Sequence, residues 1–145
     1  MLCLDTGFNI MINFFSENIP SPTLSERVIP WISQIITEEG KKEGEINYIF
    51  CDDEHLLQIN RDFLDHDYYT DIITFDYVKG KIISGDIFVS LPRIQENAKE
   101  LQCEFSFELN RVLAHGILHL CGYQDKTSEQ QQLMREKENY FLAKF

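Results

Sequence analysis

The segment 104–122, EFSFELNRVLAHGILHLCG, repeats its apolar residues at helical spacing and runs into a glycine. This pattern predicts a long helix, with Gly122 as its left-handed terminator. His115 and His119 lie four residues apart near the end of this helix, so their side chains project from the same helical face. Two imidazoles at that spacing can both bind one small species, such as a metal ion.

The rest of the sequence alternates strand-like and helix-like segments, without internal repeats or a linker that would divide it. The turn 78–81 favours an antiparallel hairpin between the last two strand segments. Together the segments indicate one α+β domain over residues 1–145, with a mixed sheet of about four strands and about five helices. The predicted strands are 8–15, 44–52, 70–77 and 85–90, and the predicted helices are 21–40, 53–64, 93–102, 104–122 and 127–145.

Composition limits the class of protein. A chain of 145 residues, 43% of them hydrophobic, can bury a core of its own. The formal net charge of −11 argues against broad, nonspecific binding to phosphate backbones or to anionic membranes. Any contact with nucleic acid must therefore be local or assisted.

The N-terminal and cysteine patterns predict a cytoplasmic protein. The apolar N-terminal segment lacks a basic start and contains Asp5, and no run approaches the roughly 18 apolar residues of a membrane span. Cys3, Cys51, Cys103 and Cys121 form no Cys-x-x-Cys pair, which argues against a zinc ribbon or a disulfide framework. We therefore expect reduced cysteines, no export and no membrane insertion.

A third candidate ligand, Asp125, follows the predicted helix end. The turn at Gly122 can bring the Asp125 carboxylate back to the two histidines, in the spacing H-x3-H-x5-D. Two imidazoles and a carboxylate suit a zinc-like ion and leave a fourth position for water. The metal-bound water held by His115, His119 and Asp125 would ionise near neutral pH and act as a nucleophile. Gly116 stands where zinc peptidases carry a glutamate base, which argues against a peptidase.

Three blocks of sequence match the motifs of a known family in order and spacing. HGILHLCGY, residues 115–123, is similar to the signature H-G-x-L-H-L-x-G-Y. NRDFLDHDYYTDIITFDY, residues 60–77, resembles N-x-x-[FY]-R-x-x-D-x-P-T-D-V-L-S-F, and GDIFVS, residues 85–90, resembles G-D-I-x-I-S. By these blocks the chain resembles the YbeY family of bacterial metal-dependent endoribonucleases, over nearly its whole length.

The resemblance implies a zinc-dependent endoribonuclease that is specific for single-stranded RNA. It implies a role in 3′-end maturation of 16S ribosomal RNA and in ribosome quality control. Ribosomal RNA and the small ribosomal subunit would be its partners, rather than DNA or a membrane. It also implies a zincin-like α+β fold, in which the metal-binding helix packs beneath a mixed sheet, and one Zn²⁺ or another divalent ion per chain.

Two positions depart from the family pattern. Asp125 stands where the family usually has a third histidine; a carboxylate also binds zinc, so we expect the site to survive with an altered metal preference. Leu64 stands where the family has an arginine that would bind phosphate. Arg61, three residues before Leu64, and Arg111, four residues before His115, are the candidates to contact RNA in its place. Surface ion pairing would explain both arginines equally well.

Several alternatives stay open from the residues themselves. His115 and His119 could be a chance pair on a polar helix face, because their spacing alone is a weak signal. An open metal site could serve a hydrolase of a peptide or a small ester. Two histidines and a carboxylate are also the ligands of non-haem iron oxygenases. Finally, the metal could only join the C-terminal helices of a ribosome-associated factor that is not an enzyme.

Overall fold

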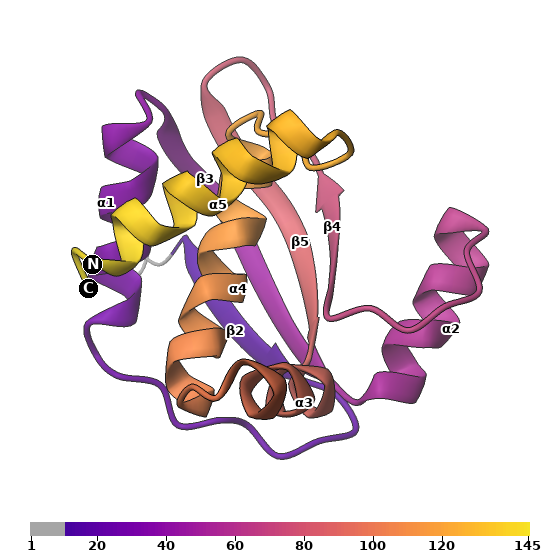
Figure 1. The fold of residues 1–145 in the computed structure, drawn as a ribbon. Helices are drawn as coiled ribbons and strands as arrows, with labels where there is room; N and C mark the ends of the chain where they lie inside the picture. Colours follow the sequence, from indigo (N-terminus) through magenta and orange to yellow (C-terminus); the bar gives the residue numbers. More distant parts are fainter. Residues whose placement is uncertain (1–10) are drawn as a thin grey trace, which may run out of the picture.

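The structure, a computed structural model, describes residues 11–145 (Figure 1). The start of the predicted strand 8–15 and the expectation of no export signal fall on residues outside this range. The described chain forms four strands and five helices. In chain order these are β2 (Ile12–Ser16), α1 (Val28–Glu38), β3 (Lys42–Cys51), α2 (Asp53–Leu64), β4 (Ile72–Asp76), β5 (Ile82–Ser90), α3 (Leu91–Leu101), α4 (Phe105–Leu120) and α5 (Ser128–Leu142).

The strands form one mixed sheet in the order β2-β3-β5-β4. β2, β3 and β5 are parallel, with Phe14 opposite Tyr48 and Tyr48 opposite Ile87. β4 pairs with β5 in the antiparallel direction, which confirms the predicted hairpin. The mixed sheet and its helices confirm the predicted α+β class. Within residues 11–145, every helix is too short or too polar to traverse a bilayer.

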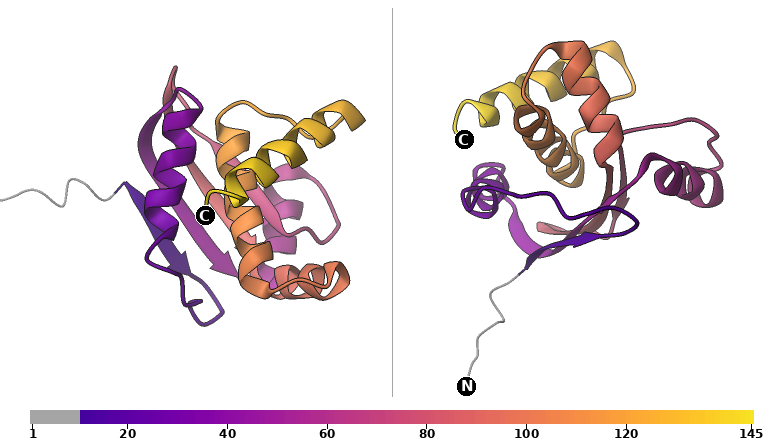
Figure 2. Two further views of the ribbon diagram at one scale, coloured as in Figure 1. Left: turned by 60° about the vertical axis from the view of Figure 1, so that its left-hand side comes forward. Right: turned by 90° about the horizontal axis from the view of Figure 1, so that it is seen from below.

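The helices divide unequally between the two faces of the sheet (Figure 2). α1, α3, α4 and α5 lie on one face and enclose the main hydrophobic core. There the buried Tyr48 hydroxyl of β3 donates a hydrogen bond of 2.8 Å to the Leu113 carbonyl of α4. α2 covers part of the other face, where Leu56 and Ile59 pack in a small second cluster with Cys51. The sheet is therefore the support on which the histidine-bearing helix α4 rests.

Prolines decide where two of the helices begin. The helix predicted over 21–40 begins only at Val28, so Pro30 lies in its first turn. Backbone N–H groups in the first turn of a helix have no intrahelical acceptor, so a proline, which lacks an N–H, costs no hydrogen bond there. Its ring also does not break the helix at this position. α3 likewise carries Pro92 in its first turn. The prediction for the first helix was wrong at its N-terminal end because it placed Pro30 in the helix interior.

Two glycines allow α4 to approach the sheet closely. A Cβ on Gly116 would lie 3.0 Å from Cγ2 of Ile87, and a Cβ on Gly85 would lie 3.0 Å from a methyl group of Leu120. Larger side chains at either position would push the end of α4 away from β5. Because Gly116 faces the core, the carboxylate of a glutamate at this position could not act on an ion held by the two histidines. The glycine at position 116 therefore has a packing reason.

Candidate metal centre

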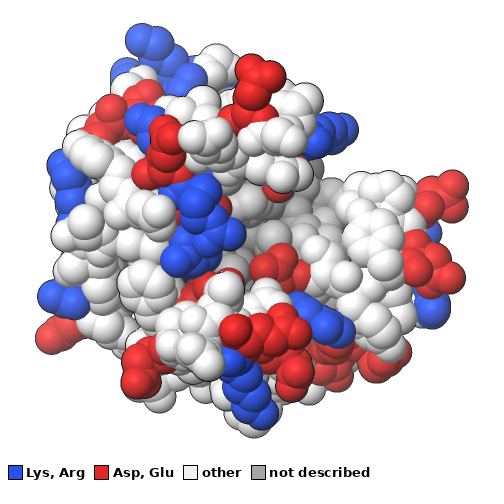
Figure 3. Space-filling model, in the orientation of Figure 1, with Lys and Arg blue, Asp and Glu red and all other residues white. Residues whose placement is uncertain are grey.

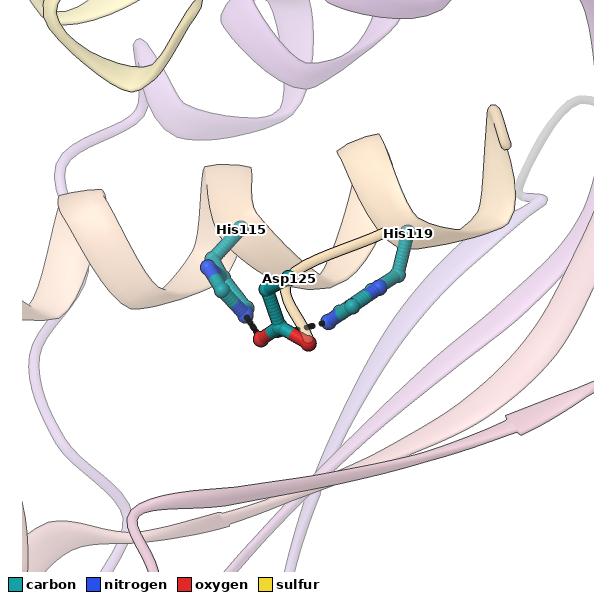
Figure 4. A group of neighbouring side chains, drawn as sticks. All are labelled: His115, His119 and Asp125. Carbon is teal, nitrogen blue, oxygen red and sulfur yellow. Dashed lines mark ion pairs between the residues drawn. The ribbon is translucent and has the colours of Figure 1, made fainter. Parts of the chain in front are cut away.

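The end of α4 turns the chain back toward its own histidines. Gly122 has a φ of +111°, and its N–H donates to the His119 carbonyl at 3.0 Å. The Tyr123 N–H donates to the Leu118 carbonyl at 3.0 Å. These two bonds form the Schellman arrangement, in which a glycine with positive φ ends a helix. The predicted glycine terminator is confirmed, and the following residues bring Asp125 across the helix end (Figure 4).

His115, His119 and Asp125 point toward one another (Figure 4). Nε2 of each histidine lies 3.3 Å from Oδ2 of Asp125, and a ligand atom from each of the three residues lies within 4.8 Å of the others. Bonds of about 2.0–2.1 Å in a tetrahedral arrangement separate neighbouring zinc ligands by about 3.3–3.4 Å. The distance from each imidazole to the carboxylate is thus that of a zinc-like site. These three residues could hold a metal ion.

The Nδ1 atoms of both imidazoles are occupied by acceptors on the far side of each ring. Nδ1 of His115 lies 2.7 Å from Oε2 of Glu138, and Nδ1 of His119 lies 2.9 Å from the Tyr123 carbonyl oxygen. A carboxylate and a carbonyl can only accept, so Nδ1 of each ring carries the proton. The lone pair of each Nε2 is then available for a metal, and the rings are held in the orientation that binding requires.

Glu138 belongs to a buried charged cluster beneath the histidines. Glu108 and Glu138 are only 4% and 3% exposed, and Arg111 donates to both at 3.2 and 3.3 Å. Burial raises the pKa of Glu108, although the Arg111 charge opposes this effect. Burial lowers the pKa of His115, but the hydrogen bond to Glu138 and the charges of Glu138, Asp125 and Asp71 together raise it overall. The cluster therefore favours positive charge at the position of His115.

The three candidate ligands open into a cavity of about 780 Å³, within the size range of ligand sites. α4 and α5 supply one side of its lining, and β4 with the loop after α2 supplies the other. Figure 3 shows a hollow with basic side chains along one rim. The side chains of His119 and Asp125 are 26% and 39% exposed, so solvent reaches the site. The charged residues of the lining are Asp71, Asp76, Glu108, Asp125, Glu138, Arg111, Lys126 and Arg135.

The two arginines predicted to contact RNA occupy different environments. Arg111 lines the cavity, but its guanidinium is bonded to buried acids and its side chain is 14% exposed. Arg61 forms an ion pair with Asp67 and is not among the described residues that line the cavity. Leu64, at the position of the family arginine, does line it. RNA contact by Arg61 or Arg111 stays a prediction.

Sequence reasoning missed Glu138. The signal was present, because Met134, Glu138 and Phe141 follow one another at core spacing in α5 and all three are buried. An acid within an apolar helical stripe needs a partner, and so suggests a special role. Its partner His115 lies 23 residues away, and no local pattern connects the two.

Replacing Glu138 by glutamine is expected to weaken metal binding about 10- to 100-fold, the usual effect of losing a group that orients a metal-binding histidine. Glutamine keeps the size of the side chain but removes the negative charge of the carboxylate that contacts Nδ1 of His115. Competition with a chromophoric zinc chelator measures the affinity. Glu136→Gln is the matched control, because Glu136 is exposed on the same helix. Equal affinities for the two variants would show that Glu138 does not support the site.

This fold places two imidazoles and a carboxylate beside a cavity, a group that could hold a metal ion as in metal-dependent hydrolases. The family model described as Endoribonuclease YbeY matches residues 11–145. The chain belongs to this family of RNA-cleaving hydrolases, which confirms the resemblance drawn from its motifs.

Individual relatives agree with the family match. Endoribonuclease YbeY of Flavobacterium johnsoniae is 54% identical over 135 residues, covering 93% of this chain and 97% of that protein. The protein of the same name from Parabacteroides distasonis is 47% identical, with coverage of 91% and 94%. The solution structure of TM1509 from Thermotoga maritima is similar with a TM-score of 0.65 and 29% identity, covering 91% of this chain and 87% of that one.

Proposed function

We propose that this protein cleaves single-stranded RNA with a Zn²⁺ ion held by His115, His119 and Asp125, and that residues 1–145 form one metallo-endoribonuclease domain. The observation that carries the proposal is the 3.3 Å spacing of the donors. The site also faces a cavity, which leaves room for a scissile phosphodiester beside the ion. Membership of the endoribonuclease family supplies the substrate class.

The chain's own groups have distinct tasks in this reaction. A bound zinc ion would supply an activated water and polarise a phosphoryl oxygen. Glu138 and the Tyr123 carbonyl hold the two imidazoles in place. Arg135 lines the cavity with 55% of its side chain exposed, and its nearest acid contact is a 3.7 Å approach to Glu138. It is therefore better placed to receive a phosphate than Arg111, whose charge balances the buried acids.

The charge of the protein affects how it binds RNA. Three arginine and lysine side chains line the cavity in a chain of net charge −11. Few phosphate contacts give weak binding of isolated RNA with a shallow dependence on salt. We propose that the small ribosomal subunit supplies further contacts, and that the substrate is ribosomal RNA, at the 3′ end of the 16S molecule, in the cytoplasm.

Two features favour this function over the alternatives. A peptidase would need a base beside the first histidine, and Gly116 is buried against the sheet. A purely structural metal would be enclosed by four protein ligands. Here the described residues offer three candidate ligands, and all three are partly exposed to solvent.

Cleavage of end-labelled RNA tests the proposal. Zinc-loaded protein is expected to cut single-stranded RNA slowly and to leave duplex RNA largely intact, because a fixed A-form backbone cannot bend into the site. Chelation should stop cleavage, and added zinc should restore it. His119→Ala protein purified in the same way controls for contaminating nucleases. If fully metallated protein cleaves no RNA, even within ribosomal particles, the structural-metal alternative takes its place.

A further inference from the structure

The wall of the cavity opposite α4 and α5 carries two exposed aromatic rings. His66 and Tyr68 lie on the loop between α2 and β4, and both line the cavity that contains the candidate metal ligands. Tyr68 is 55% exposed. The two ring centroids are 5.2 Å apart and the ring planes differ by 22°. The two rings therefore stack on each other, and the pair presents an exposed aromatic face next to the reaction site.

The backbone holds these rings in position. The Asn60 side chain, only 1% exposed, donates to the Tyr68 carbonyl at 2.9 Å. The Asn60 carbonyl accepts from the His66 N–H at 3.0 Å, and Asp65 adopts a φ of +56° that allows the chain to turn there. The Tyr68 hydroxyl and Nδ1 of His66 are 3.0 Å apart and bonded to each other. A buried asparagine therefore fixes a loop whose aromatic side chains face solvent, which lowers the entropy cost of binding a ligand.

The lining of the cavity separates two kinds of chemistry. Positive charge comes from Arg135 on α5 and Lys126 just before it, whereas the aromatic surface comes from the loop on the other side. A nucleotide has the same division, with an anionic phosphate and an aromatic base. Flat aromatic side chains near basic side chains are the usual means of binding unpaired bases, although this cavity also carries five acidic side chains.

We propose that His66 and Tyr68 form a stacking platform for one unpaired base of the RNA, while Arg135 and Lys126 hold the neighbouring phosphate at the metal centre. The inference rests on the proposed function and identifies a source of its single-strand specificity. A base within a duplex has both faces covered by its neighbours and cannot stack on Tyr68. An unpaired base can, and stacking is largely independent of which base it is.

Binding of two RNA probes to the Tyr68 variants tests the platform. The probes are a short fluorescent single-stranded oligoribonucleotide and the same backbone with abasic sites, each bound to zinc-loaded protein at low temperature, with intact RNA verified by electrophoresis. Tyr68→Ala is expected to weaken binding of the base-containing RNA roughly 5- to 100-fold and to leave binding of the abasic RNA unchanged. Tyr68→Phe should retain the affinity, because the ring and not the hydroxyl makes the contact.

Tyr77→Ala is the matched control. Tyr77 is also 55% exposed, but its hydroxyl donates to Asp86 and it does not line the cavity. Equal weakening of both RNAs by Tyr68→Ala would mean that the residue only shapes the loop, and would overturn the platform. Unchanged binding by Tyr68→Ala in protein that cleaves RNA would overturn the platform alone. Failure of the wild type to bind or cleave any single-stranded RNA would overturn the proposed function as well.

Discussion

Replacing either His115 or His119 by alanine is expected to abolish tight metal binding and, with it, RNA cleavage. Each variant keeps two of the three candidate ligands, and two ligands do not hold a zinc ion against water and buffer. The loss should exceed the roughly 10- to 100-fold effect of removing a group that only orients a ligand. Elemental analysis after desalting, together with chelator competition, measures occupancy and affinity.

His55→Ala provides the control for this experiment. His55 lies at the start of α2, where it is paired with Glu17, and it does not line the cavity. This variant should keep one zinc ion per chain and its cleavage rate. The His115 and His119 variants should remain folded, because both side chains are partly exposed and their removal takes little from the core. Circular dichroism checks this. One metal ion per chain in either of these variants would remove that histidine from the site.

Asp125 is expected to show an asymmetric response to substitution. Asp125→Ala should lose zinc affinity by more than about 100-fold, because a ligand and its charge are removed together. Asp125→His should retain the metal, since it restores the ligand set that is usual in the family. An imidazole is neutral and softer than a carboxylate, so the preference among divalent ions should shift away from the harder ones. Titration with zinc, manganese and cobalt measures both effects.

A matched aspartate separates ligation from a general change in charge. Asp67 lies on the loop after α2, and its exposed carboxylate is paired with Arg61. Asp67→Ala removes this carboxylate. It changes the net charge by the same amount as Asp125→Ala and should leave zinc affinity unaltered. If Asp125→Ala and Asp67→Ala bind zinc equally well, the third ligand lies elsewhere and the 3.3 Å contacts of Asp125 are ordinary ion pairs.

The candidate site could be predicted from the sequence because its ligands are close together in the chain. His115 and His119 are related by helical periodicity, and Asp125 follows them after a glycine turn with a recognised geometry. All of these relations operate within eleven residues and depend little on the rest of the fold. The existence and type of the strands and helices were predictable for the same reason, whereas the first residues of α1, β5 and α3 differ from the predicted ones.

The supporting residues could not be predicted in this way. Glu138 reaches His115 from a different helix, and Tyr68 reaches the cavity from a loop that precedes the histidines by nearly fifty residues. The sequence shows only that Glu138 is an acid in an apolar stripe and that Tyr68 follows a helix. Whether such groups meet the site depends on how α5 and the loop after α2 pack beside α4.

The sequence by itself therefore determined the α+β class, the helix with its paired histidines, the glycine turn and the position of the third candidate ligand. Local backbone preferences and side-chain periodicity are sufficient for each of these features. Only the tertiary structure decided that Gly116 is closed off by the sheet, that Glu138 orients His115, and that aromatic and basic side chains face each other across one cavity. These features arise from contacts between distant segments, and such contacts form only when the helices are packed on the sheet.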